Sequence, residues 1–232
     1  MQKTYCSTTP GKNWTIVRPY ITYNTNRLQL GVLEKEYWLY RSFRGRPICF
    51  HASVGEHLTT LSHGYDVALL ISRLIGNQDA LGEAFHIAPA KTIRWNDVLQ
   101  VYLEVLEDAM GKHPKVQVVD DTTMWEKVMG NHYQLCYDRC SDRIFDNSKV
   151  YRVCGQLEDV TEAKEGLRIA LKAFLQNPTW NRDMSWPAQA YMDKCTHSFA
   201  NPKEMKTLKS RLVYLFWRIM PVRLSLYIKK RF

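Results

Sequence analysis

The chain has 232 residues, of which 45% are hydrophobic and 24% charged, and this composition excludes collagen-like, low-complexity and disordered proteins. A chain of this length can bury about 70% of its unfolded surface, so the six cysteines are not needed as disulfide staples. The formal net charge is +9, but eight bases and no acid follow Glu204. The rest of the chain is therefore close to neutral. It lacks the basic face that a nucleic-acid partner requires.

The first element expected from the sequence is a strand at residues 14–17, which form a β-branched run. Arg18-Pro19 ends this strand, because proline lacks an amide hydrogen and restricts the residue before it. Apolar runs predict further strands at residues 47–50, 84–88 and 115–119.

Apolar residues at helical spacing predict helices between these strands. The helices are expected at residues 28–44, 66–75 and 96–110, and a glycine that can cap the helix follows each of them. A fourth helix is expected to start at the capping-box pattern of residues 159–162 and to stop at Asn177-Pro178. Strands that alternate with helices indicate an α/β fold with short connections.

The sequence lacks the motifs of several catalytic classes. None of the eleven glycines forms a G-x-G-x-x-G or Walker pattern, and there is no G-x-S-x-G elbow. No tyrosine has a lysine four residues later, a pair that one large class of dehydrogenases uses for catalysis. We therefore predict no catalytic residue within the chain.

Cys136, Cys140 and His132 would share one face of a helix at a spacing of four residues. Three such ligands could begin a zinc site, but no second cluster of Cys or His at ligand spacing completes it. Reduced thiols on a partly buried helix are the favoured interpretation, and we expect no metal site.

Several segments follow one another in the order of one enzyme family. Residues 14–23 resemble a T-I-x-R-P-x-x-x-Y pattern, residues 63–68 an H-V-x-D-V-A pattern and residues 82–87 a G-E-x-Y-N-I pattern. Residues 142–149 resemble an R-x-x-D-x-S-K pattern, and a G…E-G-L run leads into the last helix. No single motif is specific, but in this order they resemble the second half of the extended short-chain dehydrogenase/reductases, the NAD-dependent sugar-nucleotide epimerase/dehydratase family.

The resemblance implies an α/β fold made of two parts. These are the last strands of a Rossmann-type doubly wound sheet and the smaller mixed α/β substrate domain. Residues 1–195 would form this C-terminal part of an epimerase/dehydratase domain, and residues 196–232 a basic, amphipathic helical tail. The family's glycine loop and Tyr/Lys pair would precede residue 1, so we expect the chain to be a C-terminal portion, from a truncated or re-started reading frame.

The resemblance also implies a chemistry, hydride transfer between a sugar carbon and bound NAD or NADP with a tyrosinate as base. Because the tyrosine, the lysine and most of the NAD site are absent from this sequence, we expect the chain to be inactive alone. The cofactor-facing residues that remain are Pro19, Tyr20 and Ile21. The residues expected around the nucleotide-sugar substrate are Leu30, Leu33, Arg46, His57 and Arg143.

Two positions depart from the family's pattern. Ile21 stands where many relatives have an asparagine that touches the sugar, and Thr59 where many have a diphosphate-binding arginine. His57 is the candidate substitute for that arginine, and Arg143 is the candidate bidentate partner of the diphosphate. The departures indicate a divergent branch, of the kind expected in surface polysaccharide sugar biosynthesis.

Residues 208–232 interleave aliphatic and aromatic residues with bases. One interpretation is a segment that docks on anionic lipid or on a glycosyltransferase; the other is a helix packed on the body with its cationic side chains directed outward. Pro221 is expected to break or kink this helix. No apolar stretch reaches the roughly 20 residues of a membrane span, and the first residues contain no signal-peptide core. We therefore expect a cytoplasmic protein, peripheral at the inner face of the membrane if the tail binds lipid.

Two other functions stay open at this point. The chain could be a non-catalytic module that binds a nucleotide sugar and docks through its tail, or an unrelated α/β enzyme. Epimerase, dehydratase and reductase chemistry, the identity of the sugar and the oligomeric state also stay open.

Overall fold

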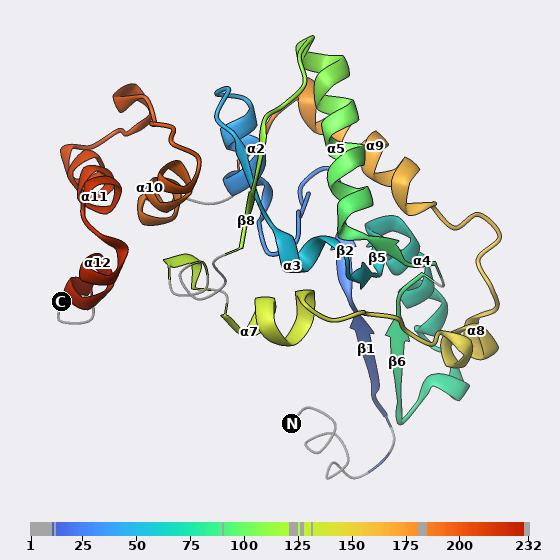
Figure 1. The fold of residues 1–232 in the computed structure, drawn as a ribbon. Coiled ribbons are helices and arrows are strands. Elements are labelled where there is room, and N and C mark those ends of the chain that lie inside the picture. The colour runs from blue at the N-terminus through green and yellow to red at the C-terminus, as the bar shows by residue number, and fades with distance from the viewer. Residues whose placement is uncertain are drawn as a thin grey trace.

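Strands and helices alternate in the first half of the chain, and the described elements beyond residue 119 are helices, as Figure 1 shows. This computed structural model describes residues 11, 13–89, 91–120, 125, 128–130, 132–180 and 185–229. The strands are β1 (Thr15–Pro19), β2 (Ile21–Tyr23), β3 (Ile48–His51), β4 (Leu58–Thr59), β5 (Leu61–His63), β6 (Glu83–Ile87), β7 (Ile93–Arg94) and β8 (Val116–Val119).

The helices are more extensive than the strands. The α-helices are α2 (Lys35–Ser42), α3 (Ala52–Gly55), α4 (Gly64–Leu74), α5 (Trp95–Met110), α7 (His132–Gln134), α8 (Ser148–Cys154), α9 (Ala163–Gln176), α10 (Trp186–Cys195), α11 (Leu208–Ile219) and α12 (Val222–Lys229). The described elements also include the 3-10 helices η1 (Gln78–Ala80) and η3 (Pro202–Glu204), and the π-helix η2 (Leu135–Arg139).

Most of the described strand pairs are parallel. β1 pairs with β6, β2 with β5 and β3 with β8, whereas β4 and β7 pair antiparallel. Parallel strands need a long crossover connection. The paired residues are accordingly far apart in the sequence: Thr15 lies opposite Glu83, and Ile48 opposite Val116. The mixed α/β class predicted from the sequence is confirmed.

The β1–β6 pair is covered by helices. In Figure 1 the two strands run side by side, with α4 and α8 next to them. A small apolar cluster fills the space between them, in which Phe85 and Ile87 of β6, Leu70 of α4 and Val150 of α8 are all buried. Parallel strands joined through a helix that packs on them are the repeating unit of a doubly wound sheet.

The larger apolar core lies around α2, α5 and α9. Trp38 of α2 stacks on Tyr102 of α5 with ring centroids 4.6 Å apart, and neither residue is exposed. Leu167 and Phe174 of α9 are buried in the same core. Aromatic side chains bury the largest apolar areas, so these contacts dominate the packing of the lobe.

The ends of α5 and α9 follow from local chemistry. α5 ends at Gly111, whose left-handed backbone (φ +67°) lets its N–H donate to the carbonyl of Glu107 over 2.8 Å. α9 begins after Glu162, whose side chain accepts the N–H of Glu165 over 3.0 Å. The capping residue is therefore Glu162 itself, three positions beyond the start of the predicted capping box.

The helix expected at residues 28–44 is shorter than predicted, because only Lys35–Ser42 is helical. The backbones of Leu30 and Leu33 bond to each other over 2.8 and 2.9 Å and form a turn. Gly31 lies inside this turn with a φ of +58°, a conformation that favours glycine. Both leucines are buried, so their apolar spacing reflects a packed loop rather than a helix.

The last helices lie together at one side of the molecule, away from the β1–β6 pair (Figure 1). Tyr214 and Trp217 of α11 are buried in the larger core, and Pro221 separates α11 from α12, as predicted. The expected boundary at residue 195 coincides with the end of α10 and stays a prediction. None of the described helices is both long and apolar enough to cross a bilayer.

A buried ionic network ties α10 and α11 to the lobe. Asp193 of α10 is fully buried and receives Arg41 Nη1 at 2.7 Å and Arg46 Nη1 at 2.9 Å. The hydroxyls of Tyr214 and Ser198 also donate to it, each over 2.7 Å. Burial raises the pKa of Asp193, but the two guanidinium groups and the two hydroxyls outweigh this and hold it below its ordinary value. The network therefore contains an ionised carboxylate.

Candidate functional site

Polar side chains gather beyond the carboxyl end of β1. Tyr20 follows β1 directly, η2 and the segment after it supply two Asp-Arg pairs, and one histidine comes from the turn before β4. We name these six residues the Tyr20 cluster: Tyr20, His57, Asp138, Arg139, Asp142 and Arg143. In open α/β sheets, ligands bind outside the carboxyl ends of the strands, so the cluster lies where a ligand site is expected.

The hydroxyl of Tyr20 is held from two sides. It donates to the carboxylate of Asp138 and accepts from Arg139 Nη1 over 3.1 Å. The Tyr20 ring lies 4.7 Å from that of Phe145. Burial raises the pKa of Tyr20 well above its ordinary value, although the charge of Arg139 opposes this. The phenol is therefore neutral at physiological pH, where it can donate a hydrogen bond but not act as a base.

Arg139 is a buried cation that holds neighbouring segments in place. Its Nε donates to the carbonyl of Gly31 over 3.1 Å, and its Nη2 to the side chain of Gln29 over 3.0 Å. Asp138 pairs with it, and the guanidinium carbon lies 5.6 Å from the ring centroid of Trp95. These contacts occupy the guanidinium on several sides, so Arg139 positions Tyr20 and the turn around Gly31.

Arg143 and His57 are basic residues whose side chains are partly exposed. Arg143 Nε donates to Asp138 over 3.1 Å, and the Nδ1 of His57 lies 3.1 Å from Asp142. About one third of each side chain is exposed, 33% for Arg143 and 34% for His57. Each group is thus oriented by a carboxylate while part of it faces solvent, an arrangement suited to an incoming anion.

The backbone of Leu58 brings these basic residues together. Its N–H donates to Asp142 over 2.9 Å, and its carbonyl accepts the N–H of Arg143 over 2.9 Å. Across the β4–β7 pair, Leu58 lies opposite Arg94, which is exposed. The Leu58 N–H and His57 hold the pKa of Asp142 below its usual value. Arg94, Arg143 and His57 therefore surround one residue and one ionised carboxylate.

Leu30 and Leu33, predicted to flank the nucleotide, are buried next to this cluster. They line a pocket of about 190 Å³ together with Gly31, His51 and Trp125. The carbonyl of Gly31 is the group that Arg139 binds. The turn that contains both leucines is therefore fixed to the cluster through Arg139.

The other predicted residues lie in three different environments. Pro19 is exposed at the end of β1, and Ile21 begins β2 and is buried in the core. Arg46 lies in the ionic network, where it pairs with Asp193 and, over 2.9 Å, with Glu204. The structure thus brings Tyr20, His57 and Arg143 into one cluster and places Arg46 elsewhere; the roles of all these residues toward a ligand stay predictions.

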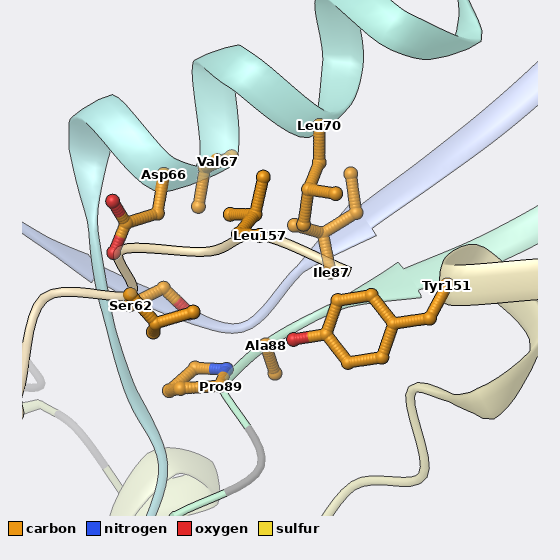
Figure 2. Close-up of a pocket in the computed structure, with 10 residues that line it drawn as sticks. Ser62, Asp66, Val67, Leu70, Ile87, Ala88, Pro89, Tyr151 and Leu157 are labelled. Carbon is orange, nitrogen blue, oxygen red and sulfur yellow. The ribbon is translucent and has the colours of Figure 1, made fainter. Parts of the chain in front are cut away.

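A second pocket, of about 240 Å³, lies between α4, the end of β6 and α8 (Figure 2). Figure 2 shows the hydroxyl of Tyr151 directed toward Ala88 and the carboxylate of Asp66 toward Ser62. Asp66 accepts the backbone N–H of Thr161 over 3.1 Å. Most of the remaining lining is aliphatic and belongs to the smaller apolar cluster.

Sequence reasoning missed four residues of this region: Asp138, Arg139, Asp142 and Arg94. A signal for three of them was present, because the dipeptide Asp-Arg occurs twice, four residues apart, in the segment 138–143. Such a repeat places like charges at the same spacing on a turn or helix. For Arg94 the sequence holds no such signal, because only the pairing of β4 with β7 brings this residue close to Leu58.

The described residues hold no group of three or more His, Cys, Asp or Glu side chains that could bind a metal ion. Cys136 Sγ lies 3.9 Å from His132 Nδ1. A dinucleotide needs closely spaced glycines so that backbone amides reach its pyrophosphate, and the sequence has none. Among the described residues, the loop at Pro19 and Tyr20 is the part that the sequence predicts to face NAD.

Comparison with known proteins gives matches in structure alone, since no protein-family model and no curated protein sequence matches the chain. The epimerase Mth375 from Methanothermobacter thermautotrophicus has a TM-score of 0.51 and 11% identity, over 70% of this chain and 43% of its own. The UDP-glucuronic acid 4-epimerase from Bacillus cereus, in complex with UDP-glucuronic acid and NAD, has a TM-score of 0.50 and 13% identity, over 70% and 45%. The dTDP-glucose 4,6-dehydratase from Bacillus anthracis str. Ames, in complex with NAD, has a TM-score of 0.50 and 16% identity, over 71% and 45%.

These similarities establish a fold. The chain spans less than half the length of each of these three structures. The expected fold is confirmed: over about 70% of its length, this chain has the fold of part of these epimerases and of the dehydratase. The ligands named for these structures belong to those enzymes. The ligand of this chain must be inferred from its own residues.

Proposed function

We propose that this chain binds a nucleotide sugar at the Tyr20 cluster, as the substrate-binding part of an NAD-dependent nucleotide-sugar epimerase or dehydratase. The observation that carries the proposal is the meeting of Arg94, His57 and Arg143 around the backbone of Leu58, with surface of all three left exposed. A diphosphate is the part of a nucleotide sugar that such a group of bases would recognise. The neighbour solved with UDP-glucuronic acid and NAD supports the same ligand class.

Each residue has a role that its contacts support. Arg143, which Asp138 orients, would bind two phosphate oxygens through its planar guanidinium. His57, oriented by Asp142, would bind the second phosphate group as an imidazolium, in which both ring nitrogens donate. Tyr20 is neutral and its single hydroxyl proton is donated to Asp138, so it would line the sugar site without removing a proton from the sugar. The turn around Gly31, which Arg139 holds, would flank the nucleotide.

The chain alone is not expected to transfer a hydride. Its sequence contains neither a Tyr-x-x-x-Lys pair nor a glycine loop, so the cofactor and the base would have to come from a separate cofactor-binding segment. A non-catalytic binding module would share the same ligand site and would need no such segment. As the substrate-binding part of an epimerase or dehydratase, the chain would serve the synthesis of a sugar for surface polysaccharides, the pathway class expected from the departures at Ile21 and Thr59.

Isothermal titration of the full chain tests the proposal. We expect UDP-glucuronic acid or dTDP-glucose to bind and uridine to bind much more weakly, because uridine lacks the diphosphate. Arg143→Gln should weaken binding about 10- to 100-fold, the range for loss of a charged hydrogen-bonding group. Arg152→Gln is the matched control, since Arg152 is an exposed arginine in the last turn of α8.

Two outcomes would overturn the proposal. One is the absence of binding for nucleotide sugars at concentrations up to about millimolar, well above the usual KM range. The other is an equal loss of affinity in Arg143→Gln and Arg152→Gln, which would show a nonspecific charge effect. Thermal melting of both variants would verify that each remains folded. Incubation of the chain with NAD and the bound sugar should leave the sugar chemically unchanged.

A further inference from the structure

α11 has two apolar faces, although a surface helix usually has one. The first face is buried against α10 and the core, with Tyr214 fully buried and Trp217 only 6% exposed. The second face is formed by four aliphatic residues that the fold leaves in solvent. We call these four the α11 stripe: Leu208 (70% exposed), Leu212 (59%), Leu215 (38%) and Ile219 (72%).

The stripe is a continuous feature of the helix surface. Its members are spaced by four, three and four residues, which is the spacing of one face of an α-helix. Exposed apolar residues continue on α12 with Leu224 and Tyr227. Single exposed leucines are ordinary, but a contiguous apolar row marks an interaction surface.

The helix is fixed so that the stripe stays outward. The Tyr214 hydroxyl donates to Asp193 over 2.7 Å and accepts the N–H of Ala200 over 2.8 Å. On the same side, Arg218 Nε donates to the carbonyl of Ser198 over 3.2 Å. Rotation of α11 to bury the stripe would break these bonds and leave Asp193 without one of its donors. These contacts therefore keep the apolar row directed toward solvent.

The charges around the stripe indicate which partner fits. Lys209 and Arg211 lie in the same helix and are exposed, and Arg223 follows in α12 and is also exposed. No acidic residue follows Glu204 in the sequence. A second copy of this surface would bring like charges together, whereas an anionic surface would neutralise them.

We propose that the α11 stripe docks the protein on an anionic lipid bilayer. α11 has 12 residues, a length of about 18 Å, and would lie parallel to the surface with its aliphatic row among the acyl chains and its bases at the headgroups. Tyr227 would sit at the boundary between the two, where aromatic side chains with one polar end are favoured. The proposal is independent of the nucleotide-sugar site, which lies on other elements.

Co-sedimentation of the full chain with vesicles tests the proposal. We expect binding to phosphatidylcholine vesicles that contain about 30% phosphatidylglycerol, and weak binding to phosphatidylcholine alone, because each base near an anionic surface contributes about a fivefold factor. Leu212→Gln/Ile219→Gln should reduce the bound fraction about tenfold or more, since two aliphatic side chains no longer enter the lipid. The matched control is Ile75→Gln/Ile169→Gln, which changes two exposed isoleucines on other elements.

A charge variant separates lipid binding from other associations. Lys209→Gln/Arg223→Gln should weaken binding to the anionic vesicles and leave the weak binding to phosphatidylcholine unchanged. Equal pelleting of the stripe variant and the unaltered chain would overturn the proposal. Self-association of the unaltered chain without lipid, measured by analytical ultracentrifugation, would also overturn the proposal if the stripe variant abolished it. The stripe would then be covered by a second copy of the chain.

Discussion

The backbone N–H of Arg143 donates to the carbonyl of Leu58 over 2.9 Å. This one bond joins the segment after η2 to β4, although the two lie far apart in the sequence. The N–H of Leu58 in turn binds Asp142, so the two backbones are fixed to each other in both directions. His57 and Arg143 thereby reach the same region of the surface, and the candidate ligand site depends on this contact.

Replacement of Asp193 by asparagine should strongly destabilise the fold. Arg41 would remain fully buried and Arg46 nearly so, without their shared counter-charge. Breaking a buried ion pair on one side costs about 3–5 kcal/mol, so urea unfolding should show a loss of that size. Asp108→Asn changes an exposed carboxylate of α5 and should have almost no effect. A loss below about 1 kcal/mol for Asp193→Asn would show that the network does not hold α10 to the lobe.

The same carboxylate predicts a dependence on pH. The pKa of Asp193 is lower in the folded chain than its ordinary value, so its stabilising contribution is complete above the unfolded pKa of about 3.9 and is lost as the pH falls through the folded value. The difference in unfolding free energy between the unaltered chain and Asp193→Asn should therefore be constant at neutral pH and shrink below about pH 4. A difference that grows in acid would contradict this assignment.

Gly166 predicts an overpacking effect inside α9. A Cβ at this position would collide with the hydroxyl of Tyr23 and would lie 2.8 Å from Thr161 Cγ2. Gly166→Ala should therefore destabilise by about 1–3 kcal/mol, although alanine is the better helix former. The hydroxyl of Tyr23 has no hydrogen-bond partner among the described residues, so the double variant Gly166→Ala/Tyr23→Phe should recover part of the loss. Denaturant unfolding of the two variants measures this; if the double variant recovers none of the lost stability, the collision with Tyr23 is not the cause of the destabilisation.

Cys49 should resist alkylation in the folded protein. It is fully buried, and burial raises the pKa of its thiol to about 12. At about pH 8 the reactive thiolate is then roughly one part in ten thousand. Cys136 and Cys140 are partly exposed and should react with iodoacetamide first. Peptide mapping by mass spectrometry, before and after addition of urea, checks the order; labelling of native Cys49 at the rate of Cys136 would contradict the burial.

The elements that could be predicted from the sequence are those whose signals are local. α5 and α9 bury a continuous apolar stripe, and Gly111 ends α5 through its own backbone conformation. β1 was predicted from β-branched residues followed by a proline. Such features depend on a few neighbouring residues, so they can be recognised without knowledge of the fold.

The parts that could not be predicted depend on contacts between distant segments. Leu30 and Leu33 match a helical spacing, but the turn at Gly31 is held by Arg139 from far along the chain. Arg46 was predicted to flank the nucleotide, yet nothing near it in the sequence indicates its pairing with Asp193. Residues 208–232 were recognised as apolar residues interleaved with bases, but only the packing of Tyr214 shows which side of α11 faces solvent.

The most direct test of the nucleotide-sugar site is observation of its side chains during a titration. In NMR spectra of the full chain, addition of UDP-glucuronic acid should shift the Arg143 Nε–H and the His57 ring signals with one common saturation curve. The Nε–H of Arg152, an exposed arginine of α8, should stay in place. Saturable binding that moves signals elsewhere and leaves Arg143 and His57 unchanged would contradict the account.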